Sequence, residues 1–255
     1  MNAVRTQSGL VVLLLGLAAV SWWSTLDHMH GMDAGPWTAL GTLGWFLGVW
    51  VVMMAAMMLP SAIPTVALYA GLARERARLG ALLFVAGYLV VWAAAGLAAF
   101  GLDAAAGHVP GDVLAWQRFG RWTAGAALLV AAGYQLTPLK DRCLSRCRAP
   151  FALLLGSWRP GVLGGFRLGL WSGAWCVGCC WALMASLFAL GVMSIAWTGL
   201  VAGLVAVEKI LPWRRVATAV TTAPLFTLGL LLLVTPGDIP GLTLPGTGPV
   251  PMLGG

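Results

Sequence analysis

The chain has 255 residues, of which 60% are hydrophobic and only 9% are charged, with a formal net charge of +7. Soluble domains carry about 25% charged residues, and a chain with so few would expose large apolar patches to water. The composition therefore excludes a soluble globular domain, an intrinsically disordered chain and a nucleic-acid-binding module, and it favours a protein that folds in a lipid bilayer.

Seven apolar segments are long enough to cross a bilayer. A spanning helix needs about 20 residues, because each residue advances about 1.5 Å and the hydrocarbon core is about 30 Å thick. The predicted spans lie at about 8–26, 45–70, 80–102, 120–138, 166–190, 194–211 and 217–234. We expect an all-α polytopic transmembrane bundle, built as a single integral membrane domain over 1–255, with a loosely ordered external tail at 235–255.

Basic residues gather on one side of this predicted bundle. With the N-terminus in the cytoplasm, every Lys and Arg except Arg118 and Arg121 falls on the cytoplasmic side. This asymmetry follows the positive-inside rule and supports a cytoplasmic N-terminus and an external C-terminus. The first segment is expected to remain as a span, because Trp22 and Trp23 after it do not resemble the small residues of a signal-peptide cleavage site.

Span 2 is rich in methionine. Four of the ten methionines, Met53, Met54, Met57 and Met58, occur within six residues. On a helical wheel the first three share a face, and Met58 lies at its edge. Thioethers are soft, neutral ligands that suit Cu(I), although methionine also fills irregular gaps in a helical core.

Span 5 carries three of the five cysteines, Cys176, Cys179 and Cys180. Cys176 and Cys180 continue a stripe of small residues, which typically lets membrane helices approach closely. We therefore expect these thiols to face another helix rather than lipid. Thiolates favour Cu(I) or Zn(II), so the cluster predicts metal or redox chemistry, with simple packing as the alternative. If spans 2 and 5 both cross fully, their sulfur atoms lie at similar depth.

Other candidate ligands lie outside these two spans. Cys143 and Cys147 occupy the basic cytoplasmic segment between spans 4 and 5, and Glu208 lies near the end of span 6 beside Lys209. Glu208 is either a functional acid or a partner of Lys209. The external segment after span 1 offers imidazole and thioether groups that could capture copper. These are His28, Met29, His30 and Met32.

Three motifs resemble a known family. They are Trp50-x-x-Met53-Met54-x-Ala56-Met57-Met58-x-Pro60-x-x-x-Pro64, Tyr134-Gln135-Leu136-Thr137-Pro138-Leu139-Lys140-x-x-Cys143-x-x-x-Cys147, and Cys176-x-Gly178-Cys179-Cys180-Trp181, followed by Glu208-Lys209-x-x-Pro212. Over about 26–215 the chain is similar to the bacterial family described as predicted metal-binding integral membrane proteins, a domain of unknown function. This resemblance implies a helical membrane protein with a metal site.

Together with this resemblance, the sequence predicts a multi-pass protein of the bacterial inner membrane that binds a soft transition metal, copper first and zinc as the alternative. Such a protein would handle the ion rather than catalyse a covalent reaction. Expected partners are the lipid bilayer and a metallochaperone or membrane metalloenzyme, and no nucleic acid. Two other classes stay open. One is a thiol–disulfide oxidoreductase that uses the cluster Cys176, Cys179 and Cys180, and the other is a non-catalytic membrane assembly partner.

Overall fold

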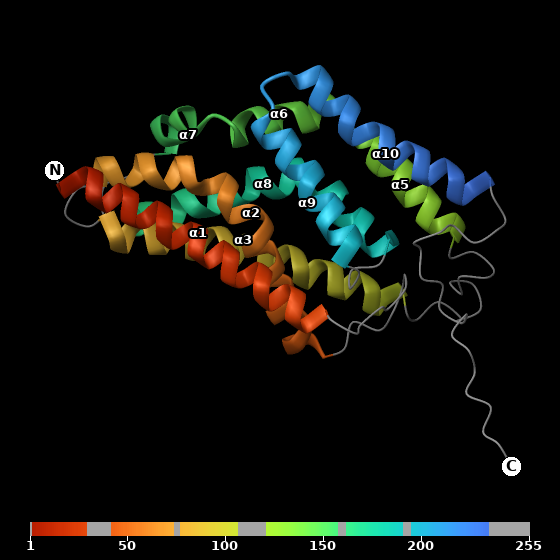
Figure 1. Ribbon diagram of the computed structural model, residues 1–255, viewed down its shortest axis with the longest axis horizontal. Helices are drawn as coiled ribbons and strands as arrows, with labels where there is room; N and C mark the ends of the chain where they lie inside the picture. The colour runs from red at the N-terminus through yellow and green to blue at the C-terminus, as the bar shows by residue number, and fades with distance from the viewer. Residues whose placement is uncertain are drawn as a thin grey trace, which may run out of the picture.

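The computed structural model describes residues 2–29, 42–73, 77–106, 121–157, 162–190 and 195–234. Within these ranges the chain is all-α, as predicted (Figure 1). The helices are α1 (Asn2–Met29), α2 (Leu43–Ala73), α3 (Ala77–Ala106), α5 (Arg121–Gln135), α6 (Pro138–Cys147), α7 (Pro150–Ser157), α8 (Val162–Leu190), α9 (Ile195–Ile210) and α10 (Arg214–Val234).

Five of these helices are long and apolar enough to cross a membrane, namely α1, α2, α3, α8 and α10. They coincide with predicted spans 1, 2, 3, 5 and 7, so the chain has the character of a multi-pass membrane protein. Helices α5 and α9 coincide with spans 4 and 6 but have only 15 and 16 residues in the described part of the chain. Their membrane crossing therefore remains a prediction.

The end of span 4 differs from the prediction. We expected this span to run to residue 138, but α5 ends at Gln135 and a new helix begins at Pro138. The hydroxyl of Thr137 accepts a hydrogen bond from the backbone N–H of Lys140 (3.3 Å) and so caps α6. Proline suits the first turn of a helix, where its missing N–H costs nothing. The basic segment after span 4 is therefore built partly of helix.

Helices α2, α3 and α8 surround the core. Helix α8 packs most extensively on α3, α1 packs on α2, and α10 packs on α5. The close approach of α8 to α3 follows from glycine, because a Cβ atom at Gly169 would collide with the backbone carbonyl of Phe84. The expectation that the small-residue stripe of span 5 faces another helix is confirmed.

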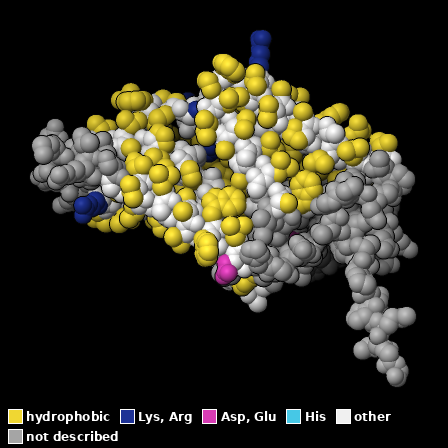
Figure 2. Space-filling view, viewed as in Figure 1, with side chains coloured by type: hydrophobic (Ala, Val, Ile, Leu, Met, Phe, Trp, Pro, Cys, Tyr) yellow, Lys and Arg dark blue, Asp and Glu magenta, His cyan; other side chains and the backbone are white. Residues whose placement is uncertain are grey.

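Many large apolar side chains lie on the outside of the bundle. Trp23 is 76% exposed, Leu102 73% and Leu155 85%. Figure 2 shows hydrophobic side chains spread across the described part of the visible face, with few charged groups among them. Such a surface would be costly in water but matches the acyl chains of a bilayer.

Candidate metal centre

Three cysteine side chains from two helices meet inside the protein. The sulfur atoms of Cys147, Cys176 and Cys179 all lie within 4.8 Å of one another. Cys176 and Cys179 are three residues apart on α8, which places them on neighbouring positions of one face. Both are almost fully buried, whereas Cys147, the last residue of α6, is partly exposed. We call these three residues the thiol cluster.

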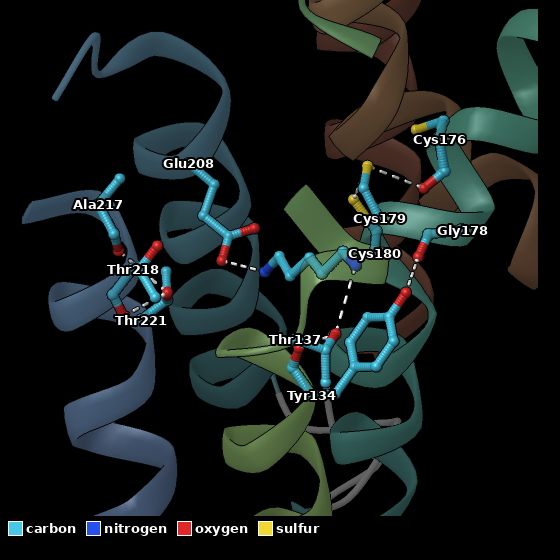
Figure 3. A network of polar contacts seen from close by, with 11 residues as sticks. Tyr134, Thr137, Cys176, Gly178, Cys179, Cys180, Glu208, Ala217, Thr218 and Thr221 are labelled. Atoms are coloured by element: carbon cyan, nitrogen blue, oxygen red, sulfur yellow. Dashed lines mark hydrogen bonds and ion pairs between the residues drawn. The ribbon is translucent and has the colours of Figure 1, made fainter. Parts of the chain in front are cut away.

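Cys180 adjoins this cluster and is also fully buried. Its Sγ lies 3.4 Å from Sγ of Cys179, whose thiol donates a hydrogen bond to the carbonyl oxygen of Cys176 (3.2 Å). Figure 3 shows all three cysteines of α8 on the part of the helix that faces its neighbours. The prediction that these thiols are buried against protein is therefore confirmed.

A methionine of span 2 reaches the thiol cluster. Sδ of Met58 lies 3.9 Å from Sγ of Cys176, and Met58 is completely buried. The sulfur atoms of spans 2 and 5, which we expected at similar depth, therefore come into contact. The contact is made by a residue that the helical wheel placed at the edge of the methionine face. A wheel describes one helix alone, and the position of α8 decides which side chain of α2 makes the contact.

The other three methionines of α2 have different surroundings. Met53 and Met54 are buried in the apolar core. Met57 lines a pocket between α2, α9 and the segment that follows α6, together with Ser61, Cys147, Lys209 and others. This pocket gives Cys147 and Lys209 a route to the outside of the bundle. The thiol cluster is therefore closed on the side of Met58 and Cys176 and accessible on the side of Cys147.

Helix α6 is held against α8 by a second cysteine. Cys143 lies against Gly178, where an added Cβ atom would come within 2.9 Å of its sulfur atom. The hydroxyl of Tyr134 donates a hydrogen bond to the carbonyl oxygen of Gly178 (Figure 3). Gly178 thus allows α6 to approach closely enough for Cys147 to join the cluster. The sequence places Cys143 and Cys147 together in one cytoplasmic segment. In the structure Cys147 lies in the thiol cluster, whereas Cys143 packs against Gly178.

A buried ion pair ties α6 to α9. Lys140 pairs with Glu208, and both side chains are almost fully buried (Figure 3). Arg148 donates a further hydrogen bond to the carbonyl oxygen of Leu211, just beyond α9. Of the two readings of Glu208, the pairing with its neighbour Lys209 is wrong. Adjacent residues on a helix point in different directions, so Glu208 faces α6 while Lys209 faces the thiol cluster.

Two polar residues complete the site, and sequence reasoning did not single them out as part of it. Nζ of Lys209 donates hydrogen bonds to Sγ of Cys176 (3.0 Å), Sγ of Cys147 (3.4 Å) and Oγ of Ser61 (3.0 Å). The hydroxyl of Tyr88 on α3 donates to Sγ of Cys176 (2.9 Å). A tyrosine and a lysine within otherwise apolar segments were the available signals, but neither indicates a partner by itself.

The thiols of α6 tend to keep their protons. Burial raises the pKa of the Cys143 thiol. A hydrogen bond with Cys176 is the main cause that raises the pKa of the Cys147 thiol. Because metals bind thiolates, an ion that enters the cluster must displace the proton of Cys147, and its apparent affinity should rise with pH.

The external candidate ligands lie outside the part of the chain that the structure describes. His30 and Met32 lie outside the described residues, and the side chains of His28 and Met29 at the end of α1 are likewise outside them. Their proposed role in capturing copper stays a prediction.

The soft donor set fits copper, because thiolate and thioether sulfur select Cu(I) and related ions over hard cations. Comparison with curated proteins and with solved structures finds no match. A family model does match, over residues 47–232, which is more than half of the chain and contains the thiol cluster, Met58 and Lys209. This match specifies copper as the metal and a chaperone as the role, which the resemblance to a metal-binding membrane family had left open. The chain belongs to the PpoB2 family of copper chaperones.

Proposed function

We propose that this protein holds Cu(I) within the membrane at the thiol cluster and passes it to a target protein. The observation that carries the proposal is the convergence of three sulfur atoms within 4.8 Å of one another. Membership of a copper chaperone family supplies the metal and implies delivery to a target. Cys147, Cys176 and Cys179 would supply thiolates, and Met58 a neutral thioether, all of them ligands that Cu(I) prefers.

The remaining candidate residues have secondary roles in this proposal. Cys180 is a fourth thiol that could replace Cys179 as the ion moves, since their sulfur atoms lie 3.4 Å apart. Met57 and the partly exposed Cys147 line the same pocket, which makes that pocket the exit through which copper is exchanged. Met53 and Met54 support α2 from the core, while Cys143 and Glu208 position α6. His28, Met29, His30 and Met32 would collect copper outside the membrane.

The proposed setting is the bacterial inner membrane, with seven spans, a cytoplasmic N-terminus and an external C-terminus. In addition to the five long helices, α5 and α9 would cross as short spans packed against their longer neighbours. The placement of Lys and Arg supports this orientation. Copper would be exchanged with a metallochaperone or a membrane metalloenzyme, because ligand exchange between sulfur sites needs a partner with its own soft donors.

Elemental analysis of the purified protein after loading with copper or zinc tests the proposal. The wild type should retain copper, and a variant with Ser at positions 147, 176 and 179 should lose it. Cys143→Ser is the matched control, because it removes another thiol of α6, outside the cluster, and serine is small enough to keep the packing against Gly178. Equal copper content in the wild type and the triple variant would refute the site.

Thiol labelling after equilibration at defined redox potentials separates copper handling from disulfide exchange. A copper chaperone should keep the cluster reduced at mildly oxidising potentials and should bind copper in that state. Reversible formation of a disulfide between Cys147 and Cys176, without copper retention, would favour the oxidoreductase instead.

A further inference from the structure

The ammonium group of Lys209 lies against two of the three sulfur atoms of the thiol cluster. Nζ of Lys209 lies 3.0 Å from Sγ of Cys176 and 3.4 Å from Sγ of Cys147, so any ion held by these two sulfur atoms must lie close to the ammonium group. An ammonium group cannot coordinate a metal ion, because it offers three donors and no acceptor. Copper binding alone therefore does not explain its position.

No carboxylate neutralises Lys209 in the described part of the chain. The ion pairs there join Lys140 to Glu208 and Arg214 to Asp141. Glu208, its neighbour in sequence, is occupied by Lys140, and the third acceptor of Lys209 is the neutral hydroxyl of Ser61 (3.0 Å). The positive charge of Lys209 consequently acts on the thiol cluster itself.

Soft sulfur ligands do not by themselves separate Cu(I) from Zn(II), since thiolates bind both ions tightly. The repulsion between an ion and a fixed positive charge, however, is proportional to the charge of the ion. Lys209 therefore disfavours a divalent ion twice as strongly as a monovalent ion at the same position. Because Cys176 and Cys179 are almost fully buried, water and salt screen this repulsion less than they would at an exposed site.

We propose that Lys209 is a specificity-determining residue that makes the thiol cluster prefer monovalent soft ions, Cu(I) in particular, over divalent ones such as Zn(II). The inference rests on the proposed function, because it assumes that the cluster binds a metal. The charge of Lys209 adds a repulsion against divalent ions that the sulfur ligands do not provide. Specificity often requires such a repulsion against the competing ligand.

Silver(I) and cadmium(II) are suitable probes, because both are soft and neither changes oxidation state under ordinary conditions. The ratio of their affinities is measured by competition with chelators for the wild type, Lys209→Gln and Lys209→Arg. Glutamine keeps an N–H donor but removes the charge, whereas arginine keeps the charge. The preference for silver should fall at least about tenfold in Lys209→Gln and should be largely retained in Lys209→Arg.

A second variant leaves Lys209 in place. Ser61→Asp puts a carboxylate beside the ammonium group, because Oγ of Ser61 already accepts a hydrogen bond from Nζ. It should lower the preference for silver in the same direction as Lys209→Gln, and Ser61→Ala serves as its neutral control. This variant tests the charge even if Lys209→Gln does not fold.

The possible failures are distinguishable. A wild type that binds neither probe refutes the proposed function and this inference together. A wild type that binds both, with the affinity ratio unchanged in Ser61→Asp or in a folded Lys209→Gln, refutes the role of Lys209 and leaves the copper site intact. A ratio that falls equally in Lys209→Gln and Lys209→Arg would assign Lys209 a merely structural role.

Discussion

The two halves of α8 carry small residues on one stripe but use them differently. In the first half, Gly169 lets α8 approach the backbone of α3 near Phe84, and the two helices pack closely there. In the second half, Cys176 contacts polar or sulfur-containing groups of four other helices, namely Met58 of α2, Tyr88 of α3, Cys147 of α6 and Lys209 of α9. The comparison teaches that a small-residue stripe in a membrane helix can serve packing and chemistry at once.

The difference has a physical origin in the neighbouring helices. Helix α3 runs along the first half of α8 as a long apolar partner, so only the volume of the side chain matters there. Helices α6 and α9 both end beside the second half, and each brings a polar residue of its last turn, Cys147 and Lys209. The ends of α6 and α9 therefore add a thiol and an ammonium group to the contacts that Met58 and Tyr88 make from within α2 and α3.

The largest expected effect is on copper affinity, and it comes from removing the thiol of Cys176 while the packing of α8 is kept. Cys176→Ser should weaken copper binding by more than about 100-fold, because a hard hydroxyl replaces a soft thiolate. Its oxygen can still accept hydrogen bonds from Tyr88 and Lys209, so thermal stability in detergent should change little. Copper affinity is measured by competition with a Cu(I) chelator. Unchanged affinity would remove Cys176 from the site and place both halves of α8 in a packing role.

A smaller effect is expected for the packing half. Gly169→Ala should reduce the free energy of unfolding by about 1–3 kcal/mol, because the added methyl group meets the carbonyl of Phe84 and forces the helices apart. The folded fraction should still bind copper in the wild-type stoichiometry. Thermal unfolding and metal content are measured on the same preparation.

The matched control for this change is Gly133→Ala on α5, where an added Cβ atom meets nothing within 4 Å. It should be neutral or slightly stabilising, because alanine favours a helix over glycine. Equal losses of stability at both positions would show that the close approach of α8 to α3 does not account for the effect.

The smallest effect is expected at the thioether. Met58→Leu should weaken Cu(I) binding by no more than about tenfold, because a neutral thioether is a weaker ligand than a thiolate and leucine preserves the packing. Met53→Leu is the comparison within the same helix and should leave the affinity unchanged. If the two substitutions have equal effects on affinity, the 3.9 Å approach of Met58 to Cys176 has no role in binding.

Several features could be predicted from the sequence because they depend on properties of single segments. Length and hydropathy indicated the five long helices, and helical periodicity indicated that Cys176 and Cys180 face protein. The residue types of spans 2 and 5 indicated a soft metal, and membership of a copper chaperone family bears this out. Each of these inferences needs only local chain geometry and the chemistry of sulfur.

The composition of the site was decided by the tertiary structure. Which methionine meets Cys176, which lysine pairs with Glu208, and whether Cys147 belongs with Cys143 or with α8 all depend on how separate helices pack. Hydropathy and helical periodicity carry no information about the distance between two helices, since the same pattern suits any apolar neighbour. Hydropathy, helical periodicity and residue types were therefore enough to predict the bilayer environment, the helices and sulfur as the ligand atom. Only the packing of α6 and α9 against α8 decided which atoms meet.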